Sequence, residues 1–180
     1  MTDSSPREGL RVVAKFGGTS LGTGDRVARA ADSVAAAVEA GHQVAVVASA
    51  MGSTTDELLD DIAFDAREDD RAEIVSMGER TSVRMLKAAL AARGVEACFL
   101  EPGHPDWPIH TDAHGEVDVD RTRERTLALA DTMDECVPVV TGFLAEDPEG
   151  NVVTLGRGGS DTTALMLGNY MDADEVVIVT

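Results

Sequence analysis

Aromatic side chains and cations are both scarce in this chain. Only 3% of its 180 residues are aromatic although 43% are hydrophobic, so a core must consist mainly of Ala, Val, Leu, Ile and Met. Fifteen Lys and Arg stand against 33 Asp and Glu, which gives a formal net charge of −18. Surfaces that bind nucleic acids need clustered cations, and anionic membranes repel a chain of this charge. The composition therefore argues against nucleic acid and membrane partners.

The acidic residues are spread along the whole chain rather than gathered in a tail. In a salt-rich cytosol the repulsion among them is screened, and carboxylates keep the surface hydrated. We therefore favour a halophilic protein, with an ordinary acidic soluble protein as the alternative.

Cysteines and long apolar runs are also rare. The two cysteines, Cys98 and Cys136, lie far apart beside apolar runs, which predicts buried reduced thiols rather than a disulfide scaffold. The longest apolar stretch, about 44–51, is too short to span a bilayer, and residues 1–9 lack the apolar segment of a secretory signal. These absences predict a soluble cytoplasmic protein.

Apolar residues follow the spacing of strands and the spacing of helices in turn. This alternation is typical of an α/β fold around a mainly parallel sheet. An acidic hinge is expected at 67–70 and a hairpin tip at 146–151. The predicted strands are 11–16, 44–48, 95–100, 137–140 and 175–179, and the predicted helices cover about 25–40, a segment from about 56, 72–93, 120–133 and 161–170.

A long irregular segment, 101–118, is punctuated by Pro, His and Trp, which predicts a surface loop or a short hairpin. His104, His110 and His114 lie in it, but their spacing fits no tetrahedral ligand pattern. A polar loop is therefore favoured over a metal site.

The first segment that carries chemistry is Lys-Phe-Gly-Gly-Thr-Ser at 15–20, between a strand and a helix. The adjacent glycines Gly17 and Gly18 let the backbone approach a ligand closely, and their amides are suited to an anion. Lys15 adds a mobile positive charge for a phosphoryl group. The order of residues is not that of a Walker A loop. A tight turn beside a lysine that reaches the surface is the alternative.

The second segment, 154–163, has the sequence Thr-Leu-Gly-Arg-Gly-Gly-Ser-Asp-Thr-Thr and opens a helix. Asp161 or Ser160 can cap that helix, but a cap explains neither the three glycines nor an arginine among so few cations. The fork of Arg157 suits a substrate carboxylate, and Asp161 is suited to orient Lys15.

Two weaker segments join these. Ser49 and Thr55 lie in a Ser-Ala-Met-Gly-Ser-Thr-Thr-Asp loop after the second strand, although Thr55 equally suits a helix cap. Gly78 precedes Glu79 inside a predicted helix, where glycine costs about 1 kcal/mol relative to alanine. A glycine there predicts the close approach of another group to Glu79, or a simple helix contact.

These four motifs, in this order, resemble those of the aspartate kinases in the amino-acid kinase family. The resemblance covers nearly all of the chain and implies a three-layer αβα sandwich. It also implies ATP and L-aspartate as substrates, Mg²⁺ held through phosphates and water, and a homo-oligomer at full length. The reaction would be transfer of the γ-phosphoryl group of ATP to aspartate, which gives 4-phospho-L-aspartate.

The same resemblance implies a role for each matching residue. Lys15 and Asp161 would be catalytic. Aspartate would contact Ser49, Thr55, Glu79, Arg157 and Ser160, and the phosphates would contact Lys15, Gly17, Gly18, Thr19, Gly158, Gly159 and Thr180.

The sequence departs from the family where it stops, at Thr180. A segment that binds the nucleotide follows this strand in the family, and paired ACT regulatory domains often follow later. We therefore expect residues 1–180 to be the N-terminal part of a kinase domain, without an ACT domain. Another amino-acid kinase, or an inactive fragment that binds aspartate, is the alternative.

Overall fold

Five parallel strands form the centre of the fold in the computed structural model, which describes residues 9–180. Val and Ala dominate the central strands, which suits strands that are buried on both faces. The strand order is β3-β4-β2-β1-β7. Their bounds are β1 (Arg11–Phe16), β2 (Gln43–Ala48), β3 (Ala97–Leu100), β4 (Val137–Thr141) and β7 (Glu175–Val179).

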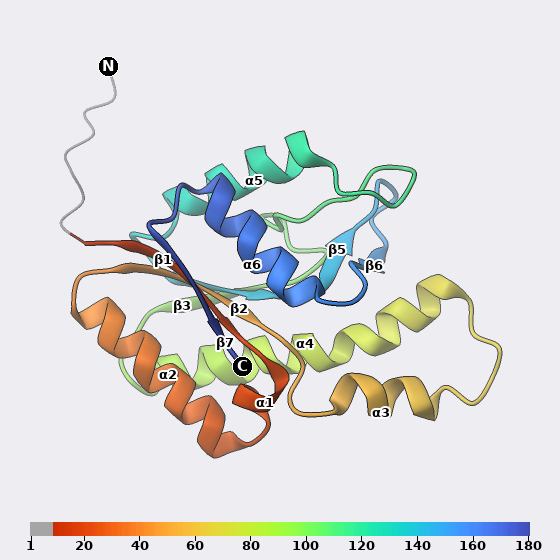
Figure 1. The fold of residues 1–180 in the computed structure, drawn as a ribbon, viewed down its shortest axis with the longest axis horizontal. Coiled ribbons are helices and arrows are strands. Elements are labelled where there is room, and N and C mark those ends of the chain that lie inside the picture. The colour runs from red at the N-terminus through yellow and green to blue at the C-terminus, as the bar shows by residue number, and fades with distance from the viewer. Residues whose placement is uncertain (1–8) are drawn as a thin grey trace.

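Helices cover both faces of this sheet (Figure 1). The helices α2 (Gly24–Glu39) and α4 (Glu68–Ala91) lie on one face, and α5 (Val119–Asp131) and α6 (Gly159–Tyr170) lie on the other. The three-layer αβα sandwich is therefore confirmed.

Neighbouring residues of one strand enter different cores. Val13 of β1 packs in the cluster that includes α5 and α6, whereas Ala14 packs in the cluster that includes α2 and α4. Successive side chains of a strand point to opposite faces, so each apolar strand contributes to both layers. Among residues 9–180, no helix is both long and apolar enough to cross a membrane.

Four smaller elements complete the described part of the chain. A short helix, α1 (Gly18–Leu21), follows β1, and sequence periodicity did not predict it. The helix α3 (Thr54–Asp61) packs against α4 and buries none of its own residues. The strands β5 (Leu144–Glu146) and β6 (Val152–Thr154) form the antiparallel hairpin predicted around 146–151.

One local prediction is wrong and another is only partly right. The expected acidic hinge at 67–70 is instead the start of α4, where Glu68, Asp69 and Asp70 form the first turn. Acidic side chains are stabilised there by the positive end of the helix dipole. The segment 101–118 is irregular as predicted, but it does not lie wholly on the surface. Its Trp107 is fully buried, and the indole Nε1 donates to the carbonyl of Ile109 at 2.7 Å.

The prediction of two separate reduced thiols is also wrong. Cys98 and Cys136 form a disulfide, with their Cα atoms 6.2 Å apart. Cys98 lies in β3 and Cys136 directly precedes β4, and these strands are parallel neighbours in the sheet. A separation of 38 residues in sequence therefore becomes a contact through strand pairing.

Candidate active site

The carboxyl ends of β1, β2 and β4, together with α4 and the start of α6, border a cavity of about 470 Å³. Ligands bind at this edge in open α/β sheets. The cavity brings together nine of the residues predicted from the sequence, and it adds Phe143, Thr154 and Gly156. The nine predicted residues are Lys15, Ser49, Thr55, Glu79, Arg157, Gly158, Gly159, Ser160 and Asp161.

Lys15 and Asp161 form an ion pair in this cavity, with Nζ and Oδ1 2.8 Å apart. Lys15 comes from the end of β1 and its side chain is only 9% exposed, whereas Asp161 comes from the first turn of α6 and is 49% exposed. The ion pair therefore holds the ammonium group at the edge of the sheet while Asp161 stays in contact with solvent.

Helix capping explains neither Asp161 nor Ser160. The N-cap of α6 is Gly158, which has a φ of 73° and makes no side-chain capping bond. Glycine adopts this left-handed conformation without a steric cost. The side chains of Ser160 and Asp161 both line the cavity instead.

Thr55 is likewise not a cap. The helix α3 begins at Thr54, and its N-cap Ser53 makes no side-chain capping bond. Thr54 donates its hydroxyl to the carbonyl of Met51 at 2.6 Å. Thr55 lies in the first turn and lines the cavity together with Ser49.

Glu79 supplies a buried carboxylate. Its Oε1 accepts a hydrogen bond from the backbone N–H of Ala50 at 3.2 Å, whereas Oε2 has no hydrogen-bond partner among residues 9–180. The side chain is 3% exposed, and desolvation by burial raises the pKa of the Glu79 carboxyl to about 7. The carboxylate is therefore ready to accept a donor from a molecule in the cavity.

Arg157 is the exposed cation of the cavity, and within residues 9–180 it forms no ion pair. It lies between Gly156 and Gly158, which both have positive φ values, of 76° and 73°. These two left-handed residues let the chain turn sharply from β6 into α6. Arg157 is therefore presented on a tight turn with its guanidinium available to a carboxylate.

Gly17, the first glycine of the pair after β1, makes a hydrogen bond within the fold. The amide of Gly17 donates to the carbonyl of Val179 at 2.9 Å, so this amide is not available to a phosphate in this conformation. A Cβ on Gly17 would lie 3.3 Å from Nζ of Lys15. Gly17 therefore leaves room for the Lys15 ammonium group.

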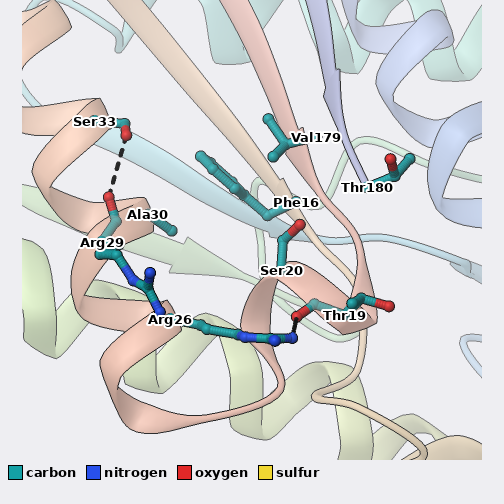
Figure 2. Close-up of a pocket in the computed structure, with 9 residues that line it drawn as sticks. All are labelled: Phe16, Thr19, Ser20, Arg26, Arg29, Ala30, Ser33, Val179 and Thr180. Atoms are coloured by element: carbon teal, nitrogen blue, oxygen red, sulfur yellow. Dashed lines mark hydrogen bonds between the residues drawn. The ribbon is translucent and has the colours of Figure 1, made fainter.

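Two of the predicted phosphate contacts, Thr19 and Thr180, do not line the cavity that holds Lys15, although a Cβ on Gly17 would lie 3.8 Å from the Cα of Thr180. Both line a second cavity of about 390 Å³ between α2 and the end of β7, together with Arg26 and Arg29 (Figure 2). Figure 2 shows Arg26 reaching the carbonyl of Thr19, to which it donates a hydrogen bond. The structure therefore does not join Thr19 and Thr180 to the cavity that holds Lys15.

Phe143 is the cavity residue that lies outside all four of the sequence motifs. It follows β4, and its φ of 68° is unusual for a bulky residue. An added Cβ on Gly159 would lie 3.0 Å from the Phe143 Cα, so the two backbones touch. The glycine that precedes Phe143 was the available signal, since it marks a turn between the predicted strand and the hairpin.

Residues 10–180 match the amino acid kinase family. Because the match covers nearly the whole described chain and the fold is a three-layer sandwich with its site at the carboxyl edge, the chain belongs to that family. It is 38% identical over 177 residues to an aspartokinase of Thermus thermophilus, which covers 94% of this chain and 42% of the relative.

Solved structures of aspartate kinases are also similar to this chain. An aspartate kinase from Synechocystis has a TM-score of 0.78 and 32% identity, and the match covers 95% of this chain and 28% of that one. E. coli aspartokinase III in complex with aspartate and ADP has a TM-score of 0.79 and 26% identity, covering 93% and 48%. The chain thus spans about two fifths of the length of the curated relatives it matches.

Proposed function

We propose that this chain is the part of an aspartate kinase that binds L-aspartate and stabilises the transferred phosphoryl group. The observation that carries the proposal is one cavity that holds the Lys15–Asp161 ion pair, the buried carboxylate of Glu79 and the guanidinium of Arg157, which has no ion-pair partner in the described part of the chain.

The charges of the cavity complement an amino acid with two carboxylates. The free Oε2 of Glu79 is suited to the α-ammonium group, and the planar fork of Arg157 is suited to a carboxylate. Ser49, Thr55 and Ser160 add hydroxyls that fix the orientation of the substrate. A hydroxyl or amine acceptor without a second carboxylate would leave Arg157 without its partner.

Phosphoryl transfer depends on positioning and on stabilising negative charge. Lys15 would stabilise the γ-phosphoryl group of ATP as it passes to the side-chain carboxylate of aspartate, and Asp161 would hold the Lys15 ammonium group in place. The product is 4-phospho-L-aspartate, the entry to lysine, threonine and methionine biosynthesis. The enzyme would be a homo-oligomer, and it would catalyse this reaction in a salt-rich cytoplasm.

The residues fit Mg²⁺ only through the nucleotide. No group of three His, Cys, Asp or Glu side chains suited to a metal occurs within residues 9–180, and Asp161 is already paired with Lys15. Mg²⁺ would therefore be held by phosphate oxygens and water, where it neutralises the charge of the phosphates. Lys15 is the chain's own contact to the same phosphates.

The proposal is tested by aspartate-dependent release of ADP and by calorimetric titration with aspartate, both in molar KCl. Glutamate, N-acetylglutamate and carbamate serve as competing acceptors, which separates aspartate kinase from other members of the family. Arg157→Ala should abolish aspartate binding, whereas Arg123→Ala, which removes an arginine stacked on Tyr170, should not. Binding without release of ADP would indicate a unit that only binds aspartate, and binding of another acceptor alone would refute the proposal.

A further inference from the structure

The loop 49–52, which follows β2, lies between two glycines of different elements. A Cβ on Gly78 of α4 would lie 2.7 Å from the Cβ of Ala50. A Cβ on Gly18 would lie 2.8 Å from the carbonyl oxygen of Gly52 and 3.0 Å from that of Ala50. Gly78 and Gly18 therefore both approach the loop 49–52 more closely than a residue with a side chain could.

The loop 49–52 has no room to retreat from α4. The amide of Ser49 donates to the carbonyl of Phe16 at 3.1 Å, and the amide of Gly52 donates to the carbonyl of Gly18 at 2.9 Å. Ala50 itself is buried. Because these bonds tie the loop to the segment that follows Lys15, a displacement at α4 is passed on toward the Lys15 side of the cavity.

Glu79 depends on this arrangement, since it directly follows Gly78 in α4. The amide of Ala50 is the hydrogen-bond donor to its Oε1, at 3.2 Å, and the described residues offer no partner to Oε2. A methyl group on Gly78 would push Ala50 away from the helix. The bond that holds the carboxylate would then lengthen or break.

We propose that Gly78 is a positioning residue for the aspartate site. Because it lets Ala50 pack against α4, it holds the Glu79 carboxylate in a fixed position relative to Gly18 and Lys15. The inference rests on the proposed function, because it assigns Glu79 to the substrate ammonium group. Alanine ordinarily stabilises a helix interior relative to glycine. Glycine at position 78 is therefore unfavourable for the helix itself but permits the contact with Ala50.

The test compares Gly78→Ala, Ala50→Gly and the double variant by calorimetric titration with aspartate in molar KCl. Gly24→Ala is the matched control, because an added Cβ there has no atom within 4 Å. We expect Gly78→Ala to weaken aspartate binding about tenfold, as expected for loss of a hydrogen bond to a charged group. Ala50→Gly in the same chain should restore binding to within about twofold of the parent, because it removes the clashing methyl group.

A second measurement follows the titration of the Glu79 carboxyl by ¹³C NMR in the same four proteins and the parent. Loss of the Ala50 hydrogen bond should raise the pKa of Glu79 in Gly78→Ala, and the double variant should return it. Unchanged binding in Gly78→Ala, or no recovery in the double variant, would overturn the inference. If the parent fails to bind aspartate while the titration responds as expected, the positioning role stands and the proposed function fails.

Discussion

Replacement of Glu79 by glutamine tests whether the binding site is maintained at the expense of stability. Burial raises the pKa of the Glu79 carboxyl from 4.5 to about 7, so the folded protein keeps a proton that the unfolded chain loses near pH 4.5. Between these values the folded state binds more protons. The unfolding free energy contributed by Glu79 therefore falls as pH rises through about 7, and stays low above it.

The magnitude follows from the two pKa values. A shift of one unit corresponds to about 1.4 kcal/mol, so the full effect is about 3 kcal/mol. Between pH 5.5 and 8.5 the parent should lose about 2 kcal/mol that the Glu79→Gln variant does not lose. Glutamine still offers an oxygen to the amide of Ala50, and any cost of its buried amide group is the same at both pH values.

The assay is urea unfolding of both proteins at pH 5.5 and 8.5, in molar KCl to screen the surface charges. The variant minus parent difference in unfolding free energy should be about 2 kcal/mol larger at pH 8.5 than at pH 5.5. Glu124→Gln, on the exposed face of α5, controls for the loss of one negative charge. A Glu79→Gln difference that is the same at both pH values, or larger at pH 5.5, would refute the reasoning.

Three further predictions concern binding, turnover and the disulfide. Aspartate binding should weaken as pH falls through about 7, by up to about tenfold per pH unit, because the Glu79 carboxylate becomes neutral. Calorimetric titration with aspartate from pH 8 to 5.5 checks this, and an affinity that does not change with pH contradicts it. In a chain extended to the length of the curated relatives, Lys15→Ala should abolish ADP release with only a modest loss of aspartate affinity, whereas Lys87→Ala should retain release. Turnover by Lys15→Ala would remove its assigned role. Reduction of the Cys98–Cys136 bond, which closes a loop of 38 residues, should lower the unfolding free energy by up to about 4 kcal/mol. Urea unfolding with and without dithiothreitol measures this change, and a Cys98→Ser variant should not respond to the reductant.

Much of the fold can be predicted from the sequence, because the spacing of apolar residues differs between strands and helices. The run Val44–Ala48 has no polar residue, and it became a central strand that is buried on both faces. The boundaries of helices were less predictable where a run of charged residues suggests a loop. The acidic residues at 68–70 look like a hinge in sequence, yet they begin a helix because the helix dipole favours them there.

The candidate site was predicted from its motifs, because residues after parallel strands meet at one edge of the sheet. Lys15 and Asp161, 146 positions apart in the chain, were paired from the chemistry of their motifs, and the structure places them 2.8 Å apart. The two cysteines were not paired, although the same strand alignment brings them together. Sequence motifs marked the chemistry of the first pair, whereas nothing local marked the second.

By itself, the sequence determined the alternation of strands and helices, the acidic surface and the motifs that place this chain in the amino acid kinase family. These depend on the kinds of residues and on their spacing. Only the tertiary structure decided which oxygen of Glu79 has no partner among residues 9–180, that Gly78 admits Ala50 against α4, and that Thr19 faces a different cavity from Lys15. Those properties depend on how closely separate segments approach, and that distance is set by packing in three dimensions rather than by the order of residues along the chain.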